Sequence, residues 1–556
     1  MYRSVILGLG LGLGIMGCVG GETPDVAEEV ILELTSPEAA AWLNDGSVNV
    51  TGVAHGLTNL QVNGETVSVQ DGTFQSTLHM ERGINVLEVS GSDARGDTHF
   101  VRHAVIAGDF ATAGSQMEDA VHLRVNKAGL EKAGTLIDAY LSPDDMIDMA
   151  MEMNPVYEDS YSVWGWEAVT VQADLDWVYF ETPELNLVPR DGYLWVEAVI
   201  PTVYVDVGVS GEVAGMDYDE PVWVSADSIV VTGEAVLNAE NGRLQADLND
   251  PQMTMHGFFI DTDLLPGGIE DGLLGDTIQA QLETMVVAQV NESLPQMLEE
   301  TLQDLDLTYQ MDLMGTEVTV SAEFGAVGVD SQGVAAKLDL QMGIPSQGDH
   351  YYRGYLTSGQ DMDPRPDYSS ALFGSISDDL MNRLMFETWR GGMLKMSLST
   401  EDESLPAAAL HHFHASEGTV SVNAGLPPVL IERDQQLTLQ LGELDVLVET
   451  PGGELGEHLQ ASIAGSADVE LKVVDGLMTM DLGNFDVTVT VRDSDWGASD
   501  EAITRMLEDN LPIASLLTLV KDFEYPVPTV AGLSIQSVSL ERDPSTVYTN
   551  MKVSLD

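Results

Sequence analysis

The sequence predicts an α+β protein in which a small N-terminal β-sandwich precedes a larger body of long strands and helices. Two observations indicate this class. Between residues 31 and 107, short alternating segments are separated by Asn63-Gly64 and Asp71-Gly72, which are typical of tight β-hairpins. After residue 113, long alternating segments are combined with stretches whose apolar residues recur every three or four positions, which favours helices.

The first residues have the parts of an export signal. Arg3 gives an early positive charge, and an apolar run leads to Ile15-Met16-Gly17-Cys18, which contains the only cysteine. The run is too short for a membrane span. Its ending resembles a bacterial lipobox, so we expect residues 1–17 to be removed and Cys18 to carry acyl chains ahead of a linker, residues 18–30. An ordinary signal peptide with an incidental cysteine is the alternative.

The predicted anchor places the protein outside the cytoplasm. We expect an exported chain that is lipid-anchored at the bacterial cell envelope and free of disulfides. Val19 gives no inner-membrane retention signal of the aspartate type, so the outer membrane is the favoured location.

The composition excludes one large class of partners. Asp and Glu total 91, Lys and Arg total 22, and the formal charge is −69. Nucleic acid is therefore not an expected partner, because phosphate contacts need clustered basic residues. The acidic residues are spread along the whole chain, which favours a solvated surface, and no calcium-binding loop of the EF-hand pattern occurs.

The segment 31–107 reads as a spacer module. The order Ser36-Pro37, Val62-Asn63-Gly64 and Gly83-Ile84-Asn85 resembles bacterial immunoglobulin-like modules that act as spacers in exported proteins. No catalytic cluster lies within it, so we expect a stalk.

The rest of the chain reads as two similar halves, each with two helices and long strands. In the first half, Leu130, Ala133, Ile137, Tyr140 and Leu141 have helical spacing, and a longer helix is predicted over residues 276–305 with a kink at Pro295. In the second half, a helical stripe from Ile376 to Trp389 ends at Gly391-Gly392, and a last helix is predicted over about residues 500–520. This plan indicates an internal duplication.

The order of these pieces resembles a known family. Ile376-Ser377-Asp378-Asp379-Leu380-Met381-Asn382 with Gly391-Gly392, and the ending Phe523-Glu524-Tyr525-Pro526-Val527-Pro528, are similar to segments of the tubular lipid-binding superfamily of bactericidal/permeability-increasing and lipopolysaccharide-binding proteins. Leu123-Arg124-Val125 with Lys127-Ala128-Gly129-Leu130 is similar to the start of that family's first barrel. The resemblance implies two elongated antiparallel β-barrels, at residues 113–345 and 368–556, joined by a linker or central sheet at residues 346–367.

Two departures from the family stand out. The family's disulfide in the first barrel is impossible here, because Cys18 has no partner. Family members that bind endotoxin present basic residues at one tip, so the acidic composition disfavours lipopolysaccharide.

The resemblance implies an apolar cleft between each barrel and its long helix, where phospholipid or another apolar lipid would bind with its head group in water. The expected lining residues lie on the predicted helices: Leu130, Ile137, Leu282, Met285, Val286, Met297, Leu380, Leu384, Met385 and Trp389. Any of these methionines could instead fill a closed core. The predicted function is lipid binding at the envelope, with lipid transfer as its extension, and a surface adhesion or scaffold protein with filled barrels is the alternative.

The sequence shows no catalytic motif. It contains no Gly-x-Ser-x-Gly elbow, no phosphate-binding glycine loop and no His-Glu-x-x-His, so we expect a protein that is not an enzyme, with a hydrolase of unknown type as a third possibility. In His411-His412-Phe413-His414, two histidines would share a strand face, but no Cys or Glu at familiar spacing completes a zinc set. No metal and no cofactor is predicted.

Overall fold

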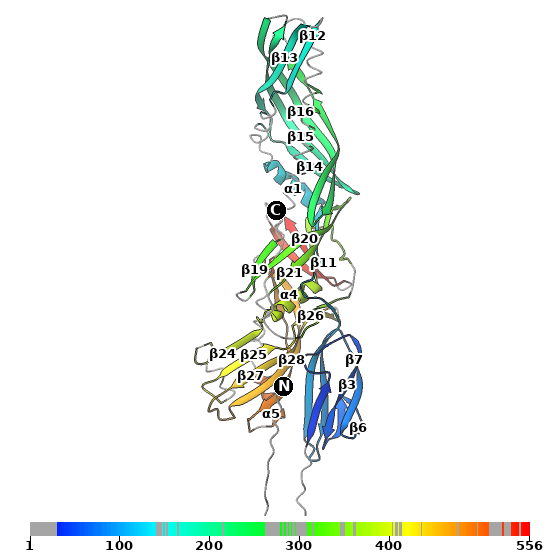
Figure 1. Cartoon of the computed structure of the whole chain (residues 1–556), viewed down its shortest axis with the longest axis vertical. Helices are drawn as coiled ribbons and strands as arrows, with labels where there is room; N and C mark the ends of the chain where they lie inside the picture. The colour runs from blue at the N-terminus through cyan, green and yellow to red at the C-terminus, as the bar shows by residue number, and fades with distance from the viewer. Residues whose placement is uncertain are drawn as a thin grey trace, which may run out of the picture. The chain divides into compact units, whose positions relative to one another are not determined.

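The computed structural model shows a predominantly β protein (Figure 1). It divides into two compact units: the described residues up to 37 with 49–77 and 88–102 form one, and residues 38–48, 78–87 and 103–556 form the other. The residues that the structure describes are 30–140, 147, 151, 154–163, 166–213, 216–261, 279–280, 283–284, 287, 291, 295, 308–313, 316–344, 351–359, 363–402, 404–405, 410, 414–434, 436–474, 477–497, 499–510, 525–526, 535–543 and 546–555.

The segment predicted as a β-sandwich forms two sheets. Their strand orders are β1 (Ile31–Ser36), β3 (Gly46–His55), β7 (Thr73–Met80), β6 (Val69–Gln70), and β2 (Trp42–Leu43), β9 (Thr98–Ala107), β8 (Gly83–Ser92), β4 (Thr58–Val62), β5 (Glu65–Thr66). Val62 pairs with Glu65 around Asn63-Gly64, and Gln70 pairs with Thr73 around Asp71-Gly72. All four turn residues have φ between 47° and 81°, the conformation of a type I′ turn, so both predicted hairpins are confirmed.

A second region is a sheet of long strands. It contains β12 (Tyr157–Val163), β13 (Trp166–Tyr179), β15 (Tyr193–Val213), β16 (Met216–Glu240) and β17 (Arg243–His256), with β14 (Glu184–Arg190) on β15 and β18 (Phe259–Asp261) on β16. One face buries a core of valine and other aliphatic side chains, including Val207, Val209 and Val222. Strand β15 continues through Pro201 and Thr202, and its register on β16 is the same on both sides of them, although Thr202 takes a φ of 53°.

A seven-stranded sheet brings both predicted barrels together. Its order is β19 (Thr308–Leu313), β20 (Thr316–Asp330), β21 (Gly333–Met342), β11 (Met117–Asn126), β23 (Leu372–Ser377), β33 (Tyr548–Leu555) and β32 (Ile535–Arg542). The first four strands come from residues 113–345 and the last three from residues 368–556. The predicted linker contributes β22 (Tyr355–Thr357), which pairs with β10 (Asp109–Ala111).

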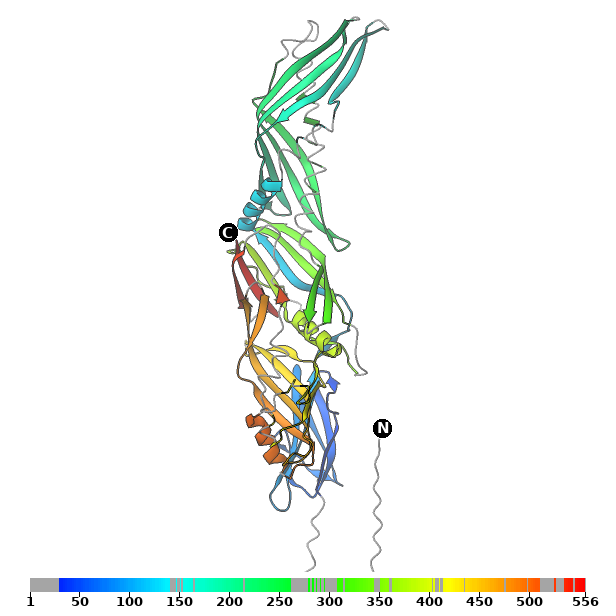
Figure 2. The same ribbon diagram turned by 90° about the vertical axis from the view of Figure 1, so that its left-hand side faces the viewer.

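The third large sheet carries its own helix. It contains β24 (Lys395–Ser399), β25 (Thr419–Ala424), β27 (Gln436–Glu449), β28 (His458–Val474), β29 (Leu477–Leu482) and β31 (Tyr525–Pro526), with β26 (Val429–Arg433) on β27 and β30 (Asp486–Ser494) on β28. Helix α5 (Asp500–Asn510) lies against β30 (Figure 2). Ile503 and Leu507 of this helix are buried with Val489, as the helical stripe predicts.

Three helices are bounded within the described residues. Besides α5 they are α1 (Lys127–Tyr140) and α4 (Asp378–Arg390), and α4 ends where Gly391-Gly392 predicts, with Gly392 at a φ of 74°. In the predicted helix 276–305, residues 279, 280, 283, 284, 287, 291 and 295 are helical; its other residues, and residues 511–520, lie outside the described part. A long helix within each barrel therefore stays a prediction. None of the described helices has both the length and the apolarity of a membrane span.

Candidate apolar ligand site

One face of the seven-stranded sheet is apolar across five strands. Its side chains form two rows in register: Val327, Ala336, Leu123, Gly374, Met551, and Val329, Val334, Val125, Leu372, Val553. The rows arise because successive residues of a strand point to opposite faces of a sheet. On β20 a register shift between Phe324 and Ala326 allows Phe324 and Val327 to share this face.

These rows form the floor of an apolar cavity. Leu244 of β17 and Phe324 of β20 contribute to its lining, together with members of both rows. The space that could take a water-sized group is about 70 Å³, within an empty volume of about 670 Å³ that includes open solvent. The surface of the cavity is almost entirely apolar, so the cavity favours the burial of apolar groups.

Gly374 leaves room at the centre of the floor. A Cβ placed there would meet the Cε methyl of Met551 at 2.9 Å, a flexible group, and the next nearest atom is a Leu123 methyl at 3.7 Å. The absence of a side chain at Gly374 thus lets the Met551 methyl lie close to the centre of the floor.

Most residues of helix α4 are buried against other parts of the protein. Leu380, Leu384, Met385 and Trp389 are all buried, and the Trp389 indole donates to the Ala424 carbonyl at 2.7 Å. The rings of Trp42, Tyr352 and Phe386 lie 5.9 to 6.3 Å from the Trp389 ring. This packing fixes the helix between β22, β26 and the seven-stranded sheet.

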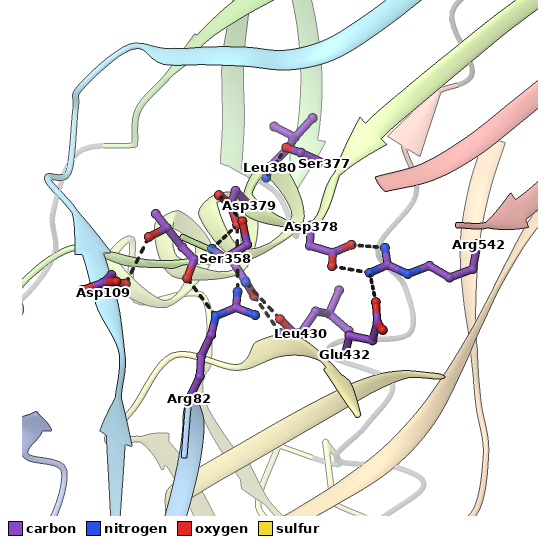
Figure 3. Close-up of polar contacts among 12 residues, drawn as sticks. Arg82, Asp109, Ser358, Ser377, Asp378, Asp379, Leu380, Leu430, Glu432 and Arg542 are labelled. Atoms are coloured by element: carbon purple, nitrogen blue, oxygen red, sulfur yellow. Dashed lines mark hydrogen bonds and ion pairs between the residues drawn. The ribbon is translucent and has the colours of Figure 1, made fainter. Parts of the chain in front are cut away.

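The start of α4 is held by buried charges (Figure 3). Ser377 caps the helix by accepting from the Leu380 amide at 3.2 Å. The Asp378 carboxylate receives both terminal nitrogens of Arg542, one at 2.7 Å, and Arg542 also donates to Glu432 at 2.9 Å. Burial raises the pKa of Asp378 to about 6, although Arg542 favours its ionised form.

A second buried pair lies further along the same helix. Arg383 Nε lies 3.0 Å from a Glu387 carboxylate oxygen, and both side chains are 1% exposed. Arg383 also donates to the carbonyls of Ser115 at 3.1 Å and Met342 at 2.8 Å, while Arg390 donates to the other Glu387 oxygen. These contacts join α4 to strands that are remote in sequence.

The structure separates the predicted lining residues into three groups. Leu130 is buried in the same apolar core as α4, and the four α4 residues are buried as described. None of these five lines the cavity of the seven-stranded sheet. Ile137 lies in α1, but its side chain is outside the described residues, as are Leu282, Met285, Val286, Met297 and Cys18. Their predicted contact with lipid stays a prediction.

An exposed aromatic surface was not anticipated from the sequence. It consists of five side chains, each 42% to 61% exposed, on one face of the long-stranded sheet: Trp177, Tyr179, Tyr204, Trp223 and Phe259. Two cross-strand rows place them together, Trp177–Asp206–Trp223–Asp261 and Tyr179–Tyr204–Ser225–Phe259. The alternation Trp177-Val178-Tyr179, with Val178 buried, was the available signal.

The predicted histidine cluster is largely outside the described residues. His414 is described, and its Nδ1 lies 3.7 Å from a Glu454 carboxylate oxygen, with both side chains exposed.

Comparisons with known proteins extend over different parts of the chain. The family model of glucodextranase, domain B, matches residues 31–108, the range predicted as a β-sandwich. No curated protein matches the chain.

Two solved structures match most of the chain at low identity. The crystal structure of lipopolysaccharide binding protein matches at 13% identity and a TM-score of 0.43, over 80% of this chain and 99% of that one. The crystal structure of P47 of Clostridium botulinum E1 matches at 9% identity and a TM-score of 0.28, over 80% of this chain and 100% of that one. Residues 31–108 are thus similar to domain B of glucodextranase.

Proposed function

We propose that this protein binds phospholipid or another apolar lipid, with the end of one acyl chain in the cavity of the seven-stranded sheet. The apolar cavity floor of two registered side-chain rows carries the proposal. The cavity volume of about 70 Å³ is below the ~300–1,000 Å³ of typical small-molecule sites. It therefore suits the end of a chain and not a whole lipid. Four buried methylenes would contribute about 3 kcal/mol.

The exposed aromatic surface supports contact with a membrane interface. Trp and Tyr prefer the head-group region, because each ring has an apolar body and a polar group. The formal charge of −69 disfavours attachment to a membrane through a basic patch. The aromatic side chains of this sheet would therefore make the membrane contact.

The proposal includes the anchor and the compartment. The Cys18 leader supports an exported chain, tethered by acyl chains at the bacterial envelope and most consistent with the outer membrane. A binding protein without catalytic activity fits the absence of catalytic motifs in the sequence. Lipid transfer between membranes would follow from reversible entry of the acyl chain.

The test is mass spectrometry of lipid extracted from the Cys18→Ser chain, which carries no acyl anchor and is purified without detergent. Ala336→Leu narrows the cavity, whereas Ala335→Leu places the same side chain on the opposite face of β21. We expect co-purified lipid in the parent and in Ala335→Leu, and its loss in Ala336→Leu. Absence of lipid from the parent, with no uptake of a fluorescent fatty acid, would favour the scaffold function with filled barrels.

A further inference from the structure

The polar face of the seven-stranded sheet carries a cluster that the sequence analysis does not predict. Asp119 and His122 lie on β11, and Asp363 lies in the segment before β23. One ligand atom from each of the three lies within 4.8 Å of the other two. The cluster is directly behind the apolar rows, because His122 and Leu123 are successive residues of one strand.

A bulge in β11 positions the first carboxylate. The register of β11 on β21 shifts between Met117 and Val121, and Asp119 takes a φ of 51° there. Its amide donates to Asp339 at 2.9 Å, and its carbonyl accepts from the Tyr548 hydroxyl at 3.3 Å. Both backbone groups of Asp119 are thus fixed by neighbouring strands.

His122 supplies an independent indication of a missing ligand. Its side chain is 9% exposed, and its Nε2 has no hydrogen-bond partner among the described residues. A buried polar atom without a partner is costly, so such an atom needs an explanation. The Tyr548 ring packs edge-on against the imidazole at 5.1 Å and fixes its position.

Lys337 now balances the two carboxylates. Its Nζ lies 2.8 Å from an oxygen of Asp119 and 2.8 Å from an oxygen of Asp363. One ammonium against two carboxylates leaves a net negative charge at the site. The Lys337 side chain is 31% exposed, which gives it a route to solvent.

We propose that Asp119, His122 and Asp363 form a binding site for a divalent transition-metal cation, with Zn²⁺ the best match, and that the cation replaces Lys337 between the carboxylates. Imidazole nitrogen and carboxylate oxygen are both ligand types that Zn²⁺ takes, and three such ligands leave a fourth position for water. Calcium fits less well, because it takes six to eight oxygen ligands. The bound ion would fasten the segment that precedes β23 to β11.

The first measurement is the absorption spectrum of the full chain titrated with Co²⁺, and then with Zn²⁺ in competition. We expect a visible d–d band from one tightly bound Co²⁺ with a nitrogen ligand, which Zn²⁺ removes. This reading separates the site from the many exposed carboxylates, which bind cations as hydrated ions. It requires no substitution, so it does not depend on the folding of a variant.

Three variants identify the ligands. We expect His122→Asn to weaken Zn²⁺ binding at least about tenfold and to abolish the Co²⁺ band. Lys337→Met removes the competing ammonium and should tighten binding. His458→Asn is the matched control, because His458 also lies on a strand, with its Nε2 3.5 Å from the Asp493 carboxylate, and it should change nothing. Absence of the band in both the parent and Lys337→Met, or equal losses in the two histidine variants, would overturn the proposal and leave Lys337 as the permanent counter-ion.

Discussion

Replacing Glu387 by Gln tests whether the buried charges of α4 stabilise the centre of the molecule. Glu387 is fully buried and lies between Arg383 and Arg390. The amide keeps the size of the side chain and removes its charge. It also directs an NH₂ group toward one of two guanidinium groups, which cannot accept a hydrogen bond.

The expected loss of stability depends on the contacts that Arg383 keeps when Glu387 loses its charge. Removing one partner of a buried ion pair costs about 3–5 kcal/mol, since the other charge stays buried without compensation. Arg383 keeps two carbonyl acceptors and the face of the Tyr355 ring at 4.9 Å, so the low end applies. About 3 kcal/mol corresponds to a roughly 100-fold larger population of the locally opened state.

Hydrogen exchange followed by mass spectrometry reads this local stability without assuming two-state unfolding of a multi-sheet chain. Amides of α4 should lose about 100-fold protection in Glu387→Gln. The matched control is Glu501→Gln on α5, which breaks an ion pair of the same four-residue spacing between two exposed side chains. Its effect should stay below about 0.5 kcal/mol.

If Glu387→Gln reduced the protection of α4 no more than Glu501→Gln reduces that of α5, the reasoning would be refuted. The carbonyls and the ring would then satisfy Arg383 without Glu387. A double variant tests whether Arg383 and Glu387 act as a pair. The double variant Arg383→Met with Glu387→Leu removes the buried Arg383 charge together with its partner. It should recover most of the lost protection, because the Arg390 side chain that remains is 14% exposed and also donates to the Ile344 carbonyl.

Three further predictions use other parts of the molecule. Burial raises the pKa of Asp378 to about 6 from 3.8. The contribution of Asp378 to stability is therefore full below pH 3.8 and is lost as the pH rises through 6. Between pH 7 and pH 5, the free energy of local opening of α4, measured by hydrogen exchange, should rise by about 1 kcal/mol more in the parent than in Asp378→Asn. An equal rise would assign the effect to the general loss of negative charge. Trp223→Ser should reduce binding of the Cys18→Ser chain to neutral phosphatidylcholine vesicles several-fold in a flotation assay, whereas unchanged binding would remove the aromatic surface from the membrane contact. Radiolabelled palmitate should label the parent expressed in bacteria and not Cys18→Ser, and label in both would exclude Cys18 as the acylated residue.

The sequence predicts features whose cause is local. A type I′ turn requires positive φ at both central residues, and Asn63-Gly64 and Asp71-Gly72 are pairs that adopt it readily, so the two hairpins could be predicted from adjacent residues. The terminal glycines mark the end of helix α4 correctly, but the predicted helical stripe begins at Ile376, which lies in β23, and the helix starts at Asp378. Strand β15 shows the limit of local reasoning: a proline suggests a break between two strands, but β15 continues through Pro201 with an unchanged register on β16.

The cavity could not be predicted in this way, because its floor depends on which strands pair. Leu123, Gly374 and Met551 lie in three segments that are far apart along the chain, and each looks like an ordinary inward residue of its own strand. The register that aligns them is a property of the whole sheet. The same holds for the proposed cation site, since Asp363 is remote from His122 and forms no motif with it. The eye-catching run His411-His412-Phe413-His414 drew attention because its residues are adjacent in sequence, which is not what a metal site requires.

The back-to-back arrangement of cavity and cation cluster makes the two proposals separable by experiment. On β11, Leu123 contributes to the cavity and His122 to the cluster. On β21, Ala336 contributes to the cavity and Lys337 contacts the two carboxylates of the cluster. A side chain that fills the cavity does not alter the ligands on the other face, so Ala336→Leu should lose lipid and keep the Co²⁺ band. Conversely, His122→Asn should lose the band and keep lipid. If either variant lost both, the sheet itself would be disturbed, and neither loss could be assigned to a site. The clean double dissociation would show that one sheet carries two binding functions on its two faces.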